Sequence, residues 1–283
     1  MKQQIIAKNK EHLQKLIKQE MALNGNECDL NHIDVSLIDD MSFLFHHSPF
    51  NGNISEWSTS NVKNMTYMFS YSVFNRGLSG WDVSKVENMN NMFSHSTFSG
   101  DISKWNTSNV VTMVFLFYNS LFTGNISEWN VSGVKDMNFM FQYAAFNGDI
   151  SGWDVSNVET MNQMFASSQF NNNISQWDVS NVEDMTGMFQ YSVFNGDISQ
   201  WNVKNVYSME GLFYKSLFNG NITDWLAVKV KKINRIFDNK EKLPYWAKID
   251  DFKDRSYAID TYHQKKQLEE NIKSSTKKDA FKI

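Results

Sequence analysis

The sequence predicts an α/β repeat solenoid of about nine 24-residue coils, with a short parallel strand and a short helix in each coil. The first observation behind this prediction is tryptophan spaced 24 residues apart without one insertion, at Trp57, Trp81, Trp105, Trp129, Trp153, Trp177, Trp201 and Trp225. The second is that a methionine and two phenylalanines follow each of the first seven tryptophans at the same spacing. Such a period is typical of stacked units that bury their apolar sides against their neighbours.

Each coil begins with a predicted strand. Ile150, Trp153 and Val155 follow the L-x-x-L-x-L spacing of leucine-rich repeats. Trp153 and Val155 alternate with Asp154, as in a strand that is buried on one face. Stacked strands of this kind would form one parallel sheet, so the predicted fold is leucine-rich-repeat-like.

A helix of about two turns is predicted next in the coil. Met161, Met164, Phe165 and Ser168 fall at positions i, i+3, i+4 and i+7, which lie on one side of a helix. The turn that closes the coil is predicted at residues 146–149, where asparagine and glycine tolerate a positive φ. The repeated Trp, Met and Phe side chains are predicted to form the core.

The 24-residue period divides the chain into three predicted parts. Residues 1–30 form an N-terminal helical cap, residues 31–237 the solenoid, and residues 238–283 a C-terminal cap with a basic, helical or flexible tail. A cap is expected because a stack of repeats has two open ends that need to be covered.

Each cap has its own pattern. The apolar side of the N-terminal helix is predicted to contain Ile5, Ile6, Leu13, Leu16, Ile17 and Met21. Asn24-Gly25-Asn26 is predicted to end that helix. Residues 243–246 are predicted to cover the last coil, residues 257–275 to form a helix, and residues 273–278 to be loosely ordered.

The recurring motif W-[DN]-V-S-x-V-x-x-M-x-x-M-F-x-x-[SA]-x-F-N-G-[DN]-I-S resembles the BspA-like leucine-rich-repeat proteins. This is a bacterial family whose repeats are also catalogued in mycoplasma lipoproteins. The resemblance covers about 200 of the 283 residues. It implies a surface or secreted protein that adheres to host proteins, and it brings no catalytic residues with it.

Charge differs between the repeats and the tail. Residues 31–225 hold 7 Lys plus Arg against 18 Asp plus Glu, a net charge of −11, and residues 226–283 hold 15 against 9, a net charge of +6. Acidic repeats speak against binding of nucleic acid phosphates, so no nucleic acid partner is expected. No apolar run is long enough for a membrane span, and no signal peptide is evident, so a cytoplasmic location is expected. The resemblance favours the cell surface or secretion instead.

Enzymatic chemistry is not expected from this sequence. It holds no glycine-rich phosphate loop, no zinc-ligand spacing and no nucleophile elbow, so neither a cofactor nor a metal is predicted. His46, His47 and His95 form the nearest approach to a histidine cluster. The single cysteine excludes an intramolecular disulfide.

Two exposed columns are the candidate partner-binding sites. One follows each tryptophan on the predicted sheet surface and contains Asp82, Asn106, Asn130, Asp154, Asp178 and Asn202. These residues would either bind a partner or only solvate the sheet, and a Ca²⁺ ladder is a further alternative. The other column would point away from the helix core and contains Phe43, Tyr67, Tyr71, Phe115, Phe139 and Tyr143. These rings would either form an interface or pack sideways between coils.

These patterns predict a non-enzymatic repeat scaffold that mediates protein–protein interaction. An immunity-type cytoplasmic protein that binds a toxin would suit the acidic repeats, because a basic partner is attracted to them. The alternative is a BspA-like bacterial surface adhesin that binds host proteins. The pattern identifies neither the partner nor the oligomeric state.

Overall fold

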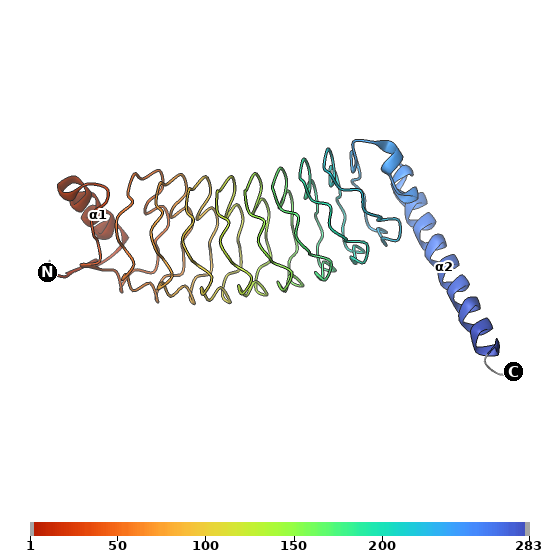
Figure 1. The fold of residues 1–283 in the computed structure, drawn as a ribbon, viewed down its shortest axis with the longest axis horizontal. Coiled ribbons are helices and arrows are strands. Elements are labelled where there is room, and N and C mark those ends of the chain that lie inside the picture. Colours follow the sequence, from red (N-terminus) through yellow and green to blue (C-terminus); the bar gives the residue numbers. More distant parts are fainter. Residues whose placement is uncertain (1–2, 281–283) are drawn as a thin grey trace.

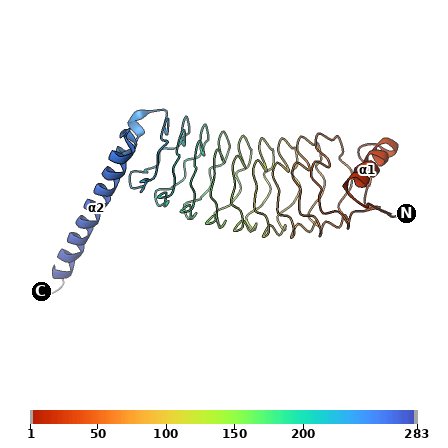
Figure 2. The same ribbon diagram turned by 180° about the vertical axis from the view of Figure 1, so that it is seen from behind.

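The repeats stack side by side into an elongated body. The structure, a computed structural model, describes residues 3–280. Figure 1 shows the coils in a row, with helix α1 (Lys10–Asn24) at one end and helix α2 (Phe252–Ala280) at the other. The view from behind in Figure 2 shows the same row. Parallel bridges join positions 24 residues apart along the row, so the chain is a repeat protein.

The segment predicted as a helix in each coil is a series of turns, and that prediction is wrong. No helix lies between residues 31 and 237, all of which are described. The Met65 N–H donates to the Asn88 carbonyl at 3.0 Å. The Tyr67 N–H donates to the Asn90 carbonyl at 2.9 Å. These backbone hydrogen bonds therefore run between coils, whereas in a helix they would run along the chain.

A left-handed backbone at two positions in each coil explains the difference. Tyr67 and Tyr71 have φ values of 57° and 55°, whereas an α-helix needs a φ near −60°. The Met68 N–H donates to the Met65 carbonyl at 3.1 Å and closes a turn around Tyr67. Successive turns still bury the side chains that were predicted as a helical stripe, namely Met161, Met164, Phe165 and Ser168.

The predicted strand at each tryptophan is also wrong. The strands of the described chain are β1 (Ile5–Ile6) and β2 (Ile33–Asp34), which pair in parallel before the first tryptophan. Trp153 and Val155 are buried and Asp154 is exposed, as the alternation predicted, but this stretch forms turns. Apart from the bridge between Asp29 and Asn53, the bridges between coils lie seven residues after each tryptophan position. The ladder therefore occupies the half of the coil that was predicted to be helical.

Hydrogen bonding explains why tryptophan repeats in the core. The Trp153 indole Nε1 donates to the Ile126 carbonyl of the preceding coil at 3.0 Å. The other seven tryptophans in the column make the same bond to a carbonyl 27 residues earlier. The Ile126 carbonyl also accepts from the Trp129 N–H at 3.2 Å, so the indole adds a second hydrogen bond to it. The buried indole N–H would cost about 1–3 kcal/mol if it had no acceptor. Phenylalanine could fill much of this space, but it could not donate this hydrogen bond.

The N-terminal end is covered by α1. The Asn9 side chain accepts from the His12 N–H at 2.8 Å and caps the helix, and Gly25 (φ 79°) ends it. Leu13, Leu16 and Ile17 are buried with the core of the first coil. Ile5 and Ile6 were predicted in this helix and instead form β1, because the helix begins after the Asn9 cap.

The C-terminal end is built from η1 (Lys240–Lys242), η2 (Tyr245–Lys248) and α2. Trp246 is fully buried in the core of this end. Arg255 is also buried, and its guanidinium donates to the Val230 carbonyl of the last coil at 2.6 Å. Burial lowers the pKa of this guanidinium.

Helix α2 continues beyond its contact with the last coil. Tyr262 and Lys266 donate to the Asp224 carboxylate at 2.9 and 2.6 Å. Residues 273–278 were predicted to be loosely ordered, but the structure places them in α2. Figure 1 shows the helix running away from the coils toward its end.

Candidate functional site

The six predicted aromatic residues occupy the left-handed turn positions. Their φ values lie between 55° and 60° at Phe43, Tyr67, Tyr71, Phe115, Phe139 and Tyr143. The side chains of Phe43, Tyr71 and Tyr143 are about half exposed, at 49%, 46% and 52%. The other three are partly exposed. We call these six residues the aromatic face.

Stacking joins the rings of the aromatic face from coil to coil. Phe115 and Phe139 stack with centroids 4.4 Å apart and planes 2° apart. Phe43 and Tyr67 stack at 4.8 Å. The sequence left open whether these rings are exposed or packed sideways between coils. The structure shows both, because each stacked ring keeps part of its surface exposed.

Histidines extend the aromatic face. His47 and His95 stack on the two sides of Tyr71, with centroid distances of 4.4 and 4.0 Å. Burial, and then the charge of His47, lowers the pKa of His46 and of His95. His47 and His95 occupy the same repeat position as Tyr71, so the sequence already placed them in the outward column. They were not among the six residues of that column predicted to bind a partner, and no metal was predicted at them.

The segments that form this side of the first seven coils carry no Asp, Glu, Lys or Arg, whereas the eighth, residues 209–216, contains Glu210 and Lys215. Asp, Glu, Lys and Arg are all absent from residues 41–48, 65–72, 89–96, 113–120, 137–144, 161–168 and 185–192. Exposed aliphatic side chains follow these segments at Val73 and Leu121. The 18 acidic residues of the repeats therefore all lie outside these seven segments. The aromatic face is uncharged, and histidines are the only titratable basic residues in the segments that carry it.

Bulky residues at left-handed positions are energetically unfavourable. A residue other than glycine loses about 1–2 kcal/mol in this conformation, and asparagine or glycine tolerates it best. Later coils place Gly187 and Gly211 at the position of Phe139. Four of the first five coils keep an aromatic ring there despite this cost, at Phe43, Tyr67, Phe115 and Phe139, and the third coil has Asn91. Strain retained in this way is typical of functional surfaces.

The Asp and Asn column has a structural role. The Asp154 carboxylate accepts from the Ser156 hydroxyl at 2.6 Å and from the Ser156 N–H at 3.0 Å. These two hydrogen bonds lower the pKa of Asp154. The same turn forms at every member of the column, which contains Asp82, Asn106, Asn130, Asp154, Asp178 and Asn202. All six are exposed. They do not line a sheet, because this stretch forms turns, so the predicted sheet surface is wrong.

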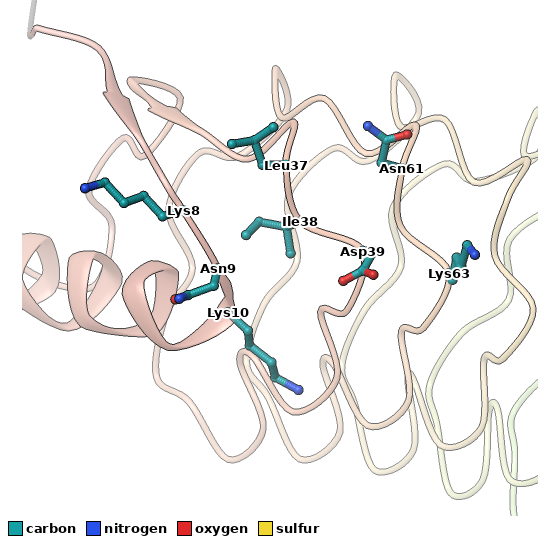
Figure 3. A pocket seen from close by; sticks show the side chains of 8 residues that line it. All are labelled: Lys8, Asn9, Lys10, Leu37, Ile38, Asp39, Asn61 and Lys63. Atoms are coloured by element: carbon teal, nitrogen blue, oxygen red, sulfur yellow. The ribbon is translucent and has the colours of Figure 1, made fainter.

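A pocket of about 470 Å³ lies at the start of α1. Figure 3 shows Lys8, Lys10 and Lys63 around it with their ammonium groups pointing in different directions. Lys10 is already paired with Asp40 at 2.9 Å. These cations therefore do not converge on a shared anion. Within residues 3–280, no three His, Cys, Asp or Glu side chains are grouped as metal ligands.

Comparisons with known proteins identify one family. The family model described as "Mycoplasma protein of unknown function, DUF285" matches residues 11–120, 94–193, 144–252 and 166–274 in four overlapping steps. No curated protein and no solved structure matches the chain. None of the helices in the described part of the chain is long and apolar enough to cross a membrane. Because the family matches together span residues 11–274, the chain belongs to this family of Mycoplasma repeat proteins, DUF285.

Proposed function

We propose that this protein is a non-enzymatic scaffold that binds another protein through its aromatic face. The observation that carries this proposal is the set of bulky rings held at left-handed positions on an exposed, uncharged side. The cores of protein interfaces are depleted of charge and enriched in aromatic residues. The rings are also held in place by stacking, so little conformational entropy would be lost on binding.

The net charge of the repeats favours a basic partner. The repeat position next to the ladder is itself mixed, because Glu87, Glu159 and Glu183 share it with Lys63 and Lys135, and Lys135 pairs with Glu159 at 3.1 Å. The repeats as a whole carry a net charge of −11. Such a surface accelerates association with a basic protein. An immunity-type protein that binds a basic toxin in the cytoplasm fits this charge pattern.

A surface adhesin is the second candidate. The repeat motif that resembles BspA-like leucine-rich-repeat proteins supports it. Localisation of a tagged chain in the source cell separates the two candidates, because an adhesin is accessible to protease added outside the cell. The Asp and Asn column is left out of both proposals, since its side chains hold turns.

The test of the aromatic face is a triple substitution, Tyr67→Ser with Phe115→Ser and Phe139→Ser. The control is Val111→Ser with Tyr207→Ser, which removes exposed side chains from a different column. Both variants and the wild type serve as baits in lysate of the source cell. We expect one stoichiometric protein with the wild type and the control and none with the triple variant, while circular dichroism shows that all three are folded.

Retention of that protein by the folded triple variant would contradict the proposed face. If none of the baits captures a protein, the cytoplasmic proposal fails. The same baits are then tested against host extracellular proteins, as the adhesin candidate requires.

A further inference from the structure

Every coil of the repeat region is joined to the next by hydrogen bonds from alternate residues. In the last complete set, the backbone N–H groups of Met209, Gly211 and Phe213 donate to the carbonyls of Lys232, Asn234 and Ile236, each at 2.8 Å. The same three bonds recur in all seven preceding coils. The side of a coil that faces the C-terminal end therefore carries donors two residues apart.

The last coil has these donors but no following coil. Among residues 3–280, no hydrogen bond starts from the backbone nitrogens of Ile233, Arg235 or Phe237. Arg235 has a φ of 56°, so the turn keeps the geometry of the inner coils. Ile233 is partly exposed and Arg235 is exposed. The ladder thus ends in an open edge that has the backbone shape needed to pair once more.

This edge is basic, in contrast to the repeats before it. Lys229, Lys231, Lys232 and Arg235 fall within residues 229–235, which contain no acidic residue. All four are exposed. Glu210 holds the equivalent repeat position one coil earlier, and Asp238 follows the stretch in the sequence. Lys231 lies over the Phe252 ring of α2, with its Nζ 5.7 Å from the ring centroid.

The geometry and charge of the edge define what would fit it. An extended peptide presents the carbonyls of alternate residues on one side, which matches donors on alternate residues. Acidic side chains on that peptide would pair with the lysines and Arg235. A second copy of this chain does not fit end to end, because α1 buries Leu13, Leu16 and Ile17 against its first coil. Figure 1 shows α1 at that end.

We propose that the open edge of the last coil, at Ile233 and Arg235, binds an extended acidic segment of another protein by backbone pairing. The peptide carbonyls accept from the two N–H groups, and its carboxylates lie against Lys231 and Lys232. This site is separate from the aromatic face, and it does not depend on the function proposed there.

The test is amide hydrogen exchange of the full chain, resolved by residue with NMR. The probe is a capped ten-residue peptide of alternating Glu and Val, and the control peptide has Lys in place of Glu. In the free protein, we expect Ile233 and Arg235 amides to exchange much faster than those of Met209 and Gly211, which are paired. The acidic peptide at about ten times its dissociation constant should slow Ile233 and Arg235 about tenfold.

A charge-reversed variant tests the role of the basic residues. Lys231→Glu with Lys232→Glu and Arg235→Glu should abolish the protection, while Met209 and Gly211 stay slow and report an intact stack. The matched control, Lys85→Glu with Lys104→Glu and Lys204→Glu, reverses three exposed charges on other coils and should bind like the wild type.

Three results would overturn the proposal. The first is no protection by millimolar acidic peptide, and the second is equal protection by the Lys and Val peptide. The third is protection that rises with the concentration of the protein alone, which would show that a second copy covers the edge.

Discussion

At the scale of single residues, the left-handed positions distinguish this coil from a helix. Among residues 3–280, fifteen residues other than glycine have positive φ, and Gly187 and Gly211 take the same conformation in later coils. For these two glycines the conformation costs little, whereas a side chain with a Cβ is strained there. The strain is therefore unevenly distributed along the stack, and it is greatest where the aromatic face lies.

Gly187→Ala should lower the free energy of unfolding by about 1–2 kcal/mol, because alanine is strained at a φ of 59°. The added Cβ would also lie 3.0 Å from the Gln163 side chain, which is flexible enough to move. The control is Gly152→Ala, where φ is not positive and no atom lies within 4 Å of the new Cβ. It should leave stability unchanged or raise it by about 0.4–1 kcal/mol. Urea denaturation measures both, and equal effects would contradict the strain.

Residue patterns predicted burial better than backbone conformation. The Trp, Met and Phe columns are buried as predicted, because a regular apolar spacing reports which side chains face the core. The spacing of Met161, Met164 and Phe165 fits a helix, but turns centred on left-handed residues bury the same positions. Phe, Tyr and Gln give no local sign of positive φ, since it is unfavourable for them. The position of the six rings outside the core was thus predicted, but with the wrong secondary structure.

At the scale of elements, the two ends are held by different contacts. Helix α1 covers the first coil with apolar side chains, and its end was predicted from Gly25, whereas its start after the Asn9 cap was not predicted. Helix α2 is attached through Arg255, which is only 2% exposed. Sequence could not predict this contact, because a buried arginine has no pattern that separates it from the exposed cations around it.

Replacing Arg255 with Met should release the start of α2 from the last coil. The guanidinium donates to the carbonyls of Val230, Ile249 and Asp250, and hydrogen bonds to charged groups contribute about 1.5–3 kcal/mol each. Hydrogen exchange in α2 should become faster while the amides of the inner coils stay protected. Lys253→Met, an exposed residue of the same helix, is the control. Unchanged exchange in α2 of the Arg255 variant would show that Tyr262 and Lys266 hold the helix without it.

At the scale of the whole molecule, each coil depends only on its neighbours. Backbone bonds, ring stacks and indole bonds all join adjacent coils, as in the stack of Phe141 on Phe165 at 5.6 Å. The stability of such an array is close to a sum over its units and interfaces. The length of the stack is therefore a variable that can be changed while the fold is kept.

Deletion of residues 129–152 removes one complete period and joins Glu128 to Trp153. The ladder, the Trp column and the Phe column all match again across the junction, so the shortened chain should fold. Its urea m-value should fall in proportion to the surface lost.

Deletion of residues 129–140 removes half a period, which places the Phe column of one coil against turn residues of the next. That variant should unfold or aggregate, because buried rings and indole donors lose their partners together. Circular dichroism and tryptophan fluorescence measure both variants, and equal stability of the two deletions would show that the register between coils does not hold the stack together.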